Sequence, residues 1–159
     1  MHEHGGGTGS AIAQGGPTAI LVGQPNVGKS VIFGRLTGKY AVVSNYPGTS
    51  VEVTTGSLRV GETTFTVIDT PGINSLHPHS DDERVTRDIL LERRPDVIVQ
   101  VADAKNLSRA LSLTSQLLEF GCPLVLCLNM SDEAEQAGVH IDVRELSRLL
   151  GVEVIRTTA

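Results

Sequence analysis

The chain has 159 residues, a formal net charge of -5 and a pI near 5.5. This length fits one compact domain with a sizeable core, and the acidic balance excludes a broad electrostatic surface for nucleic acid or an anionic membrane. The apolar runs are strand-sized and much shorter than the roughly 20 residues that a spanning helix needs, so we expect this chain itself to be soluble.

The first 16 residues are rich in glycine and lack an apolar segment, so we expect a flexible tail outside the fold. The folded domain is expected to run from Pro17 to Ala159. Cys122 and Cys127 flank or occupy an apolar strand, where free thiols behave as small core hydrophobes. Neither a disulfide nor a metal site is predicted for them.

Strand-like and helix-like stretches alternate after the tail. Residues 18–23 form an apolar run that ends at glycine, and a helix-compatible stretch over 29–36 follows. Residues 51–70 hold two β-rich stretches joined by Gly61 and Glu62, which indicates a hairpin and an antiparallel edge strand. The elements expected next are a helix from Ser80, a strand at 96–103, a helix at 107–120, a strand at 123–129, a helix at 142–150 and a strand at 152–159.

Two helix starts carry a capping pattern, Ser80 with Glu83 and Asp142 with Glu145. The acidic residues 81–82 then lie at the positive end of a helix dipole, which explains them without a metal. The whole alternation is typical of an α/β domain. We expect a mostly parallel six-stranded sheet with one antiparallel edge strand and helices on both faces.

Ligands of such sheets sit at the carboxyl ends of the strands. The first strand runs into GQPNVGKS, which fits the phosphate-loop pattern G-x-x-x-x-G-K-[ST] and predicts a P-loop NTPase. Backbone N–H groups of this loop would wrap the phosphates, Lys29 would reach the β and γ oxygens, and the Ser30 hydroxyl would bind magnesium. The nucleotide-binding residues predicted here are Gly23, Gln24, Pro25, Asn26, Val27, Gly28, Lys29, Ser30 and Val31.

The third strand ends in DTPG, residues 69–72, which adds Thr70 and Pro71 to the predicted site. Asp69 would hold magnesium through water, and the Gly72 N–H would meet the γ-phosphate. We predict Gly72 and Lys29 as catalytic residues. Many GTPases have a glutamine after this glycine that orients the attacking water; Ile73 cannot do so.

The fifth strand ends in NMSD, where Asn129 and Asp132 predict guanine recognition. A carboxylate here accepts hydrogen bonds from the guanine N1–H and exocyclic amine, whereas adenine presents the wrong edge, so GTP is preferred over ATP. Met130 replaces a lysine common in GTPases, which keeps the apolar cover, loses the charge and predicts modest affinity with fast GDP exchange. NMSD alone also fits an ordinary helix start. The last strand ends in Thr157, Thr158 and Ala159, expected beside the guanine O6.

Together these segments resemble the GTPase domain of the bacterial ferrous iron transport protein B family, within the TrmE/Era-like P-loop GTPases. The resembling stretches are GQPNVGKS, VSNYPGTSVEV, DTPGINSL with the polar loop and DDERVTRDILL after it, NMSDEAEQAG, and TTA after LLGVEV. They cover nearly everything from Pro17 to Ala159. The resemblance implies a GTPase that hydrolyses GTP to GDP with magnesium and is stimulated by potassium.

The resemblance also implies a role for Asn26. In similar potassium-dependent GTPases an asparagine of the phosphate loop helps hold potassium where an arginine finger would otherwise stabilise the transition state. Asn26 occupies that place and is therefore predicted as a catalytic residue and a potassium ligand. Backbone groups of the first switch, residues 44–50, would aim the water instead of Ile73. Asn26 has an alternative role as a turn residue that bonds its own loop.

The first switch departs from the family's usual Gly-Val-Thr-Val-Glu, because this chain has GTSVE from Gly48. Register favours Ser50 as the magnesium ligand, with Thr49 as the alternative. Tyr46 stands where the family often has tryptophan. It is expected either to pack near the nucleotide or to be a half-buried loop aromatic.

We predict no iron site at the histidines. His77 and His79 flank Pro78, and His2 and His4 lie in the tail. Imidazole pairs can bind divalent metals, but solvated loop and tail residues are the simpler interpretation.

The resemblance implies a larger parent protein. The chain stops before the closing helix, the spacer and the membrane part of such proteins, so we expect a fragment of reduced stability. The parent would sit at the cytoplasmic face of the bacterial inner membrane and regulate Fe(II) uptake. The implied partners are GTP, GDP, the membrane permease domain and a second copy in a homo-oligomer, with no nucleic acid. The alternatives are a soluble GTPase of ribosome assembly or RNA modification, and a GTP-dependent switch module with little turnover.

Overall fold

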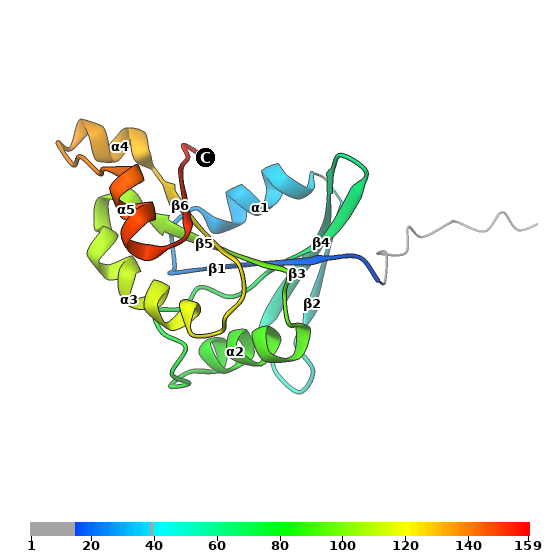
Figure 1. The fold of residues 1–159 in the computed structure, drawn as a ribbon. Helices are drawn as coiled ribbons and strands as arrows, with labels where there is room; N and C mark the ends of the chain where they lie inside the picture. The colour runs from blue at the N-terminus through cyan, green and yellow to red at the C-terminus, as the bar shows by residue number, and fades with distance from the viewer. Residues whose placement is uncertain (1–14, 39) are drawn as a thin grey trace, which may run out of the picture.

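A seven-stranded sheet organises the computed structural model, which describes residues 15–38 and 40–159 (Figure 1). The tail predicted for residues 1–16 lies outside the described residues except for its last two. The strands are β1 (Thr18–Gly23), β2 (Ala41–Asn45), β3 (Glu52–Val60), β4 (Thr63–Asp69), β5 (Val97–Asp103), β6 (Leu124–Asn129) and β7 (Glu153–Arg156), in the spatial order β2-β3-β4-β1-β5-β6-β7. The helices are α1 (Lys29–Thr37), α2 (Asp81–Arg93), the 3-10 turn η1 (Ala104–Asn106), α3 (Leu107–Leu118), α4 (Ser131–Gln136) and α5 (Val143–Leu150).

The predicted α/β class with a mostly parallel sheet is confirmed, and the sheet has one strand more than the six expected. β3 runs antiparallel to both of its neighbours, β4 and β2, and every other pairing is parallel. The antiparallel strand is therefore one in from the edge, and β2 is the edge strand. β2 was not predicted because all five of its residues are exposed, so it has no alternation between buried and exposed positions.

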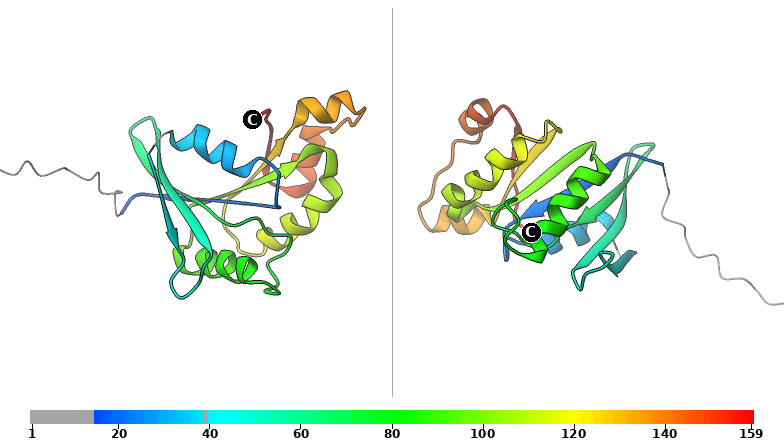
Figure 2. Two further views of the ribbon diagram at one scale, coloured as in Figure 1. Left: turned by 180° about the vertical axis from the view of Figure 1, so that it is seen from behind. Right: turned by 90° about the horizontal axis from the view of Figure 1, so that it is seen from below.

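Helices cover both faces of the sheet (Figures 1 and 2). On one face α1 packs Ile32 and Phe33 against buried residues of β1, β4 and β5. On the other face α2 and α3 pack around Ile20 and Ile98, and α4 joins a third cluster around Leu126 and Leu128. This packing leaves the carboxyl ends of the parallel strands free to carry loops.

The α1 face is less covered towards β7. Val99 on β5 and Val125 on β6 are half-buried neighbours in register, and Ile155 on β7 is 42% exposed. Among the described helices, only α1 contributes side chains to the hydrophobic cluster on this face of the sheet. Reduced stability of the chain stays a prediction.

The two predicted helix caps differ. Ser80 and Glu83 form the full capping box of α2, with both backbone-to-side-chain distances at 3.2 Å. Asp142 accepts the Glu145 N–H at 3.0 Å, but the Glu145 carboxylate pairs with Arg148 of the next turn. The second half of the predicted box is therefore missing in α5, because an arginine three residues on offers the carboxylate a charged partner.

Within residues 15–38 and 40–159, none of the helices has the length and apolar character needed to span a membrane.

Candidate nucleotide-binding site

The phosphate loop, residues 23–30, joins the end of β1 to the start of α1, as the sequence predicts. A cavity of about 460 Å³ opens over it, which is large enough for a nucleotide. Its lining residues are Gln24, Pro25, Asn26, Gly28, Lys29, Ser30, Val31, Gly72 and Asp82. The structure thus brings the phosphate loop together with the glycine of DTPG and with the first turn of α2.

Two predicted loop residues lie beneath the cavity. Gly23 is buried, and a Cβ there would lie 2.5 Å from the carbonyl oxygen of Val101. Val27 is buried in the core below α1. Both residues therefore lie on the core side of the phosphate loop, and only their backbone groups can contribute to nucleotide binding.

The loop conformation depends on residues with positive φ. Asn26 has φ +63° and Gly28 has φ +84°. Asparagine tolerates this left-handed region better than other side chains, and glycine adopts it freely. A Cβ on Gly28 would also lie 2.3 Å from the Asn129 side-chain nitrogen. This geometry gives Asn26 a turn role, and its side chain still borders the cavity.

Lys29, Ser30 and Asp69 form one polar cluster at the floor of the site. The Lys29 ammonium contacts the Asp69 carboxylate and the Thr70 carbonyl. The Ser30 hydroxyl donates to the other Asp69 oxygen at 3.3 Å. Lys29 and Asp69 are both buried. A hydroxyl and a carboxylate side by side supply the oxygen ligands that magnesium prefers.

The DTPG loop is fixed against the phosphate loop. Thr70 is buried, and its hydroxyl donates to the Leu21 carbonyl at 2.7 Å. Gly72 packs so closely that a Cβ would lie 2.9 Å from Pro25 Cα. Ile73 is only 1% exposed, belongs to the core, and donates its N–H to the Gly23 carbonyl at 2.9 Å. The Ile73 side chain therefore lies in the core and does not line the cavity over the phosphate loop.

Two side chains of α3 hold the residues after DTPG. Arg109 donates to the Asn74 side-chain oxygen at 2.9 Å, and Gln116 accepts the Leu76 N–H at 2.6 Å. Gln24 of the phosphate loop donates to the Arg109 carbonyl at 3.2 Å. Sequence reasoning missed Arg109, Gln116 and Asp82, because α3 and the start of α2 have ordinary helical patterns.

Asn129 is the centre of the predicted guanine site. It is fully buried and donates to the Val27 carbonyl at 3.0 Å. Its oxygen accepts the Thr157 hydroxyl and the Ala159 N–H, each at 3.0 Å. One side chain thereby joins β6, the phosphate loop and the C-terminal loop.

The other residues predicted for the guanine site lie at the start of α4 and in the C-terminal loop. Met130 precedes α4 with φ +57°, and Asp132 is exposed in the first turn of α4. Residues 129–132 therefore lead into α4, and Asn129 among them also connects β6 to the phosphate loop and the C-terminal loop. Thr158 is exposed, and Thr157 also lies 3.1 Å from the buried Cys127 thiol, whose pKa is raised by burial.

The first switch is not brought to the phosphate cavity. Thr49 donates its hydroxyl to the Tyr46 carbonyl at 2.9 Å and accepts the Val51 N–H at 3.1 Å. Gly48 and Ser50 are exposed. The loop therefore occupies a position in which neither candidate magnesium hydroxyl lines the site.

Tyr46 packs as a half-buried loop aromatic. Its hydroxyl donates to Glu92 of α2 at 3.0 Å, and its ring lies against the core. Burial and the hydrogen bond to Glu92 raise the pKa of Tyr46. It borders a second cavity of about 460 Å³ between the first switch and α2.

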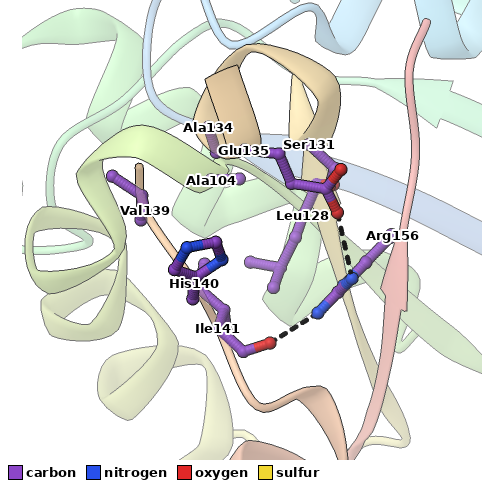
Figure 3. Close-up of a pocket in the computed structure, with 9 residues that line it drawn as sticks. All are labelled: Ala104, Leu128, Ser131, Ala134, Glu135, Val139, His140, Ile141 and Arg156. Carbon is purple, nitrogen blue, oxygen red and sulfur yellow. Dashed lines mark hydrogen bonds and ion pairs between the residues drawn. The ribbon is translucent and has the colours of Figure 1, made fainter. Parts of the chain in front are cut away.

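A smaller cavity lies beside α4 and β7 (Figure 3). Arg156 bridges it, donating to Glu135 at 3.3 Å and to the Ile141 carbonyl at 2.5 Å. At about 70 Å³ it is too small for a nucleotide. The cavity over the phosphate loop is both large enough and lined by the residues of the phosphate-loop motif, which makes it the candidate site. His77 and His79 are exposed and border no part of that cavity.

Comparison with known proteins gives consistent results. The family model of ferrous iron transport protein B matches residues 17–159. An Fe(2+) transport protein A/Fe(2+) transporter FeoB fusion protein from Porphyromonas gingivalis is 44% identical over 138 residues, which are 86% of this chain and 16% of the relative. The Fe(2+) transporter FeoB of Legionella pneumophila is 43% identical over 141 residues, 86% of this chain and 19% of the relative.

Solved structures agree with these matches. The cytosolic domain of L. pneumophila FeoB has a TM-score of 0.85 and 41% identity, covering 89% of this chain and 62% of that chain. A GDP-bound mutant of S. thermophilus NFeoB has a TM-score of 0.84 and 42% identity, covering 89% of this chain and 56% of that chain. The chain thus spans less than a fifth of the length of the two curated relatives.

Proposed function

This chain belongs to the ferrous iron transport protein B family, and from that premise we propose that it binds GTP and hydrolyses its γ-phosphate. The observation that supports this most is the meeting of Lys29, Ser30 and Gly72 around one cavity at the carboxyl edge of the sheet. Asp69 contacts both Lys29 and Ser30 there. GTP is preferred because Asp132 offers a carboxylate to the guanine edge. A related domain is solved with GDP.

The residues take separate roles in this proposal. The Lys29 ammonium exchanges its present partners for the β and γ oxygens, and the Gly72 N–H meets the γ-phosphate. Ser30 and Asp69 would hold magnesium, and Asn26 would hold potassium. When bound, the two cations neutralise the negative charge that develops on the transferred phosphoryl group.

The first switch completes the site after a loop movement. Ser50 is the better magnesium ligand, because the Thr49 hydroxyl already donates and accepts within its own loop. Backbone groups of residues 44–50 then aim the water. The buried Ile73 side chain supports this assignment, because it leaves no side chain at that position to do so.

In the parent protein the domain regulates Fe(II) uptake through a membrane permease domain, at the cytoplasmic face of the inner membrane. GTP and GDP are its ligands.

The test is GTP hydrolysis in potassium and in sodium at equal ionic strength, measured for the unsubstituted chain and for its Asn26→Gly variant. Glycine keeps the positive φ of position 26 and removes only the side chain. We expect faster turnover in potassium, lost in Asn26→Gly. Equal rates in both salts would reject the potassium role, and no turnover with any cation would favour a binding switch.

A further inference from the structure

Lys105 connects the end of β5 to the start of α4, directly beside the guanine site. Its ammonium lies 3.6 Å from the Met130 sulfur and pairs with Glu133 in the first turn of α4. Asp103, the last residue of β5, lies 3.8 Å from the same ammonium. Lys105 itself sits in η1, where its N–H donates to the Asp103 carboxylate at 2.9 Å.

Met130 extends from Lys105 to the phosphate loop. Its terminal methyl would lie 3.9 Å from a Cβ built on Gly28, and its sulfur faces the Lys105 ammonium. Met130 has φ +57°, a conformation that methionine adopts only when its surroundings hold it there. The contacts on both sides of Met130 therefore influence the orientation of the following residues, Ser131 and Asp132.

Carboxylates surround Lys105 and keep it charged. The hydrogen bond to Glu133 is the main cause of its raised pKa. Burial opposes this effect, and the negative charges of Asp103, Glu133 and Asp132 act in the same direction as the hydrogen bond. The lysine side chain is 31% exposed and the Glu133 side chain 55%. A pair this open to solvent contributes little to stability, so any effect of Lys105 on binding is expected to be small.

We propose that Lys105 is a positioning residue for guanine recognition: seated on the Met130 sulfur and held by Glu133, it fixes the first turn of α4 and with it the orientation in which Asp132 meets the base. Lys105 places a positive charge beside the methionine that replaces the usual lysine of this motif. The inference rests on the proposed guanine-nucleotide site.

Glu135 provides a matched control on the same short helix. It carries the same charge as Glu133, but its partner is Arg156 across the small cavity (Figure 3). Glu133→Gln and Glu135→Gln therefore make the same chemical change two residues apart, and only the first removes a partner of Lys105.

The experiment measures dissociation constants of GDP, inosine diphosphate and ADP by competition with a fluorescent GDP. Inosine diphosphate lacks the exocyclic amine, so it forms one hydrogen bond with Asp132 where GDP forms two. We expect Lys105→Met and Glu133→Gln to raise the dissociation constant of GDP by about two- to fivefold and that of inosine diphosphate by less. The ratio of the inosine diphosphate constant to the GDP constant should therefore fall. The double variant is expected to resemble either single variant, and Lys105→Arg and Glu135→Gln to keep the parent ratio.

Each outcome decides a separate question. An unchanged ratio in Lys105→Met, equal weakening of both nucleotides, or additive effects in the double variant would overturn the positioning role. Thermal melting of every variant identifies any general loss of folding, and Glu133→Gln, which removes the partner of Lys105, still tests the inference if Lys105→Met unfolds. If the parent chain binds GDP no better than ADP, the proposed guanine site itself fails, independently of Lys105.

Discussion

The side-chain amide of Asn129 donates a 3.0 Å hydrogen bond to the backbone carbonyl of Val27, across 102 positions of the chain. The oxygen of the same amide accepts from Thr157 and Ala159. Because Asn129 is fully buried, water cannot replace any of these bonds. One buried side chain therefore connects the phosphate loop to the C-terminal loop, residues 157–159.

Asn129→Asp tests this connection. The substitution keeps the size and the acceptor but replaces the donor to Val27 with a carboxylate that faces a carbonyl. We expect the free energy of unfolding to fall by about 1–3 kcal/mol, the usual cost of a buried group left without its partner. Chemical denaturation measures the change.

The control for Asn129 is Asn45→Ala on the exposed edge strand β2. A surface change of this kind is expected to stay within about 0.5 kcal/mol of the parent. Equal losses in both variants would contradict the special role of Asn129.

Gly28 and Gly34 give opposite predictions for the same change to alanine. At Gly28, φ is +84° and a Cβ would collide with the Asn129 side chain. We expect Gly28→Ala to weaken GDP binding at least about tenfold, because the left-handed strain alone costs roughly 1–2 kcal/mol. Gly34 lies within α1 with open space around its Cβ position.

Gly34→Ala should therefore stabilise the chain by about 0.5–1 kcal/mol, since glycine is a poor helix former. Calorimetry for GDP binding and thermal melting for stability measure the two effects. Unchanged GDP binding in Gly28→Ala would contradict the loop geometry described above. Destabilisation by Gly34→Ala would contradict the open space around that position of α1.

Much of the site could be predicted from the sequence, because its residues follow buried strands. The apolar run of β1 predicts where GQPNVGKS lies, and DTPG and NMSD follow β4 and β6 in the same way. Parallel strands bring their carboxyl ends to one edge. Position in the sheet therefore predicts that Lys29, Asp69 and Asn129 converge.

The parts that could not be predicted depend on tertiary contacts. β2 has no pattern because both of its faces are exposed. Asp82 looks like a helix-start residue and also borders the phosphate cavity. The internal bonds of Thr49 cannot be inferred from GTSVE, since a hydroxyl that binds metal and one that closes a turn have the same residue type.

Ser80→Ala tests the cap of α2. Alanine removes the acceptor of the Glu83 N–H, so the free energy of unfolding should fall by about 1 kcal/mol. Ser115→Ala is the matched control, because Ser115 lies on the exposed side of α3 and bonds only the nearby Ser112 carbonyl. We expect it to change stability by at most a few tenths of a kcal/mol. A larger loss in Ser115→Ala than in Ser80→Ala in urea denaturation would be inconsistent with the capping box.

Thr49→Val and Ser50→Ala separate the two candidate magnesium ligands. If Ser50 is the ligand, Ser50→Ala raises the magnesium concentration needed for half-maximal GTP hydrolysis. Thr49→Val removes the turn bonds to Tyr46 and Val51 and is expected to leave that concentration near the parent value. Rates measured across a magnesium titration decide between them, and the reverse order would assign the ligand to Thr49.

The contact between Tyr46 and Glu92 makes a prediction at alkaline pH. Burial, then the Glu92 hydrogen bond and charge, raise the Tyr46 pKa above its usual 10.0. Ionisation is thus harder in the fold than in the unfolded chain, so this group adds stability below pH 10 that is lost as pH rises through the folded pKa.

The chain has two tyrosines, so Tyr40→Phe isolates the Tyr46 titration by ultraviolet absorbance. We expect a midpoint above 10, and a lower midpoint when Glu92→Gln is added, because that change removes a negative charge while burial persists. An unchanged midpoint after Glu92→Gln would mean that burial alone holds the phenol neutral, and that the first switch is not tied to α2 through this hydrogen bond.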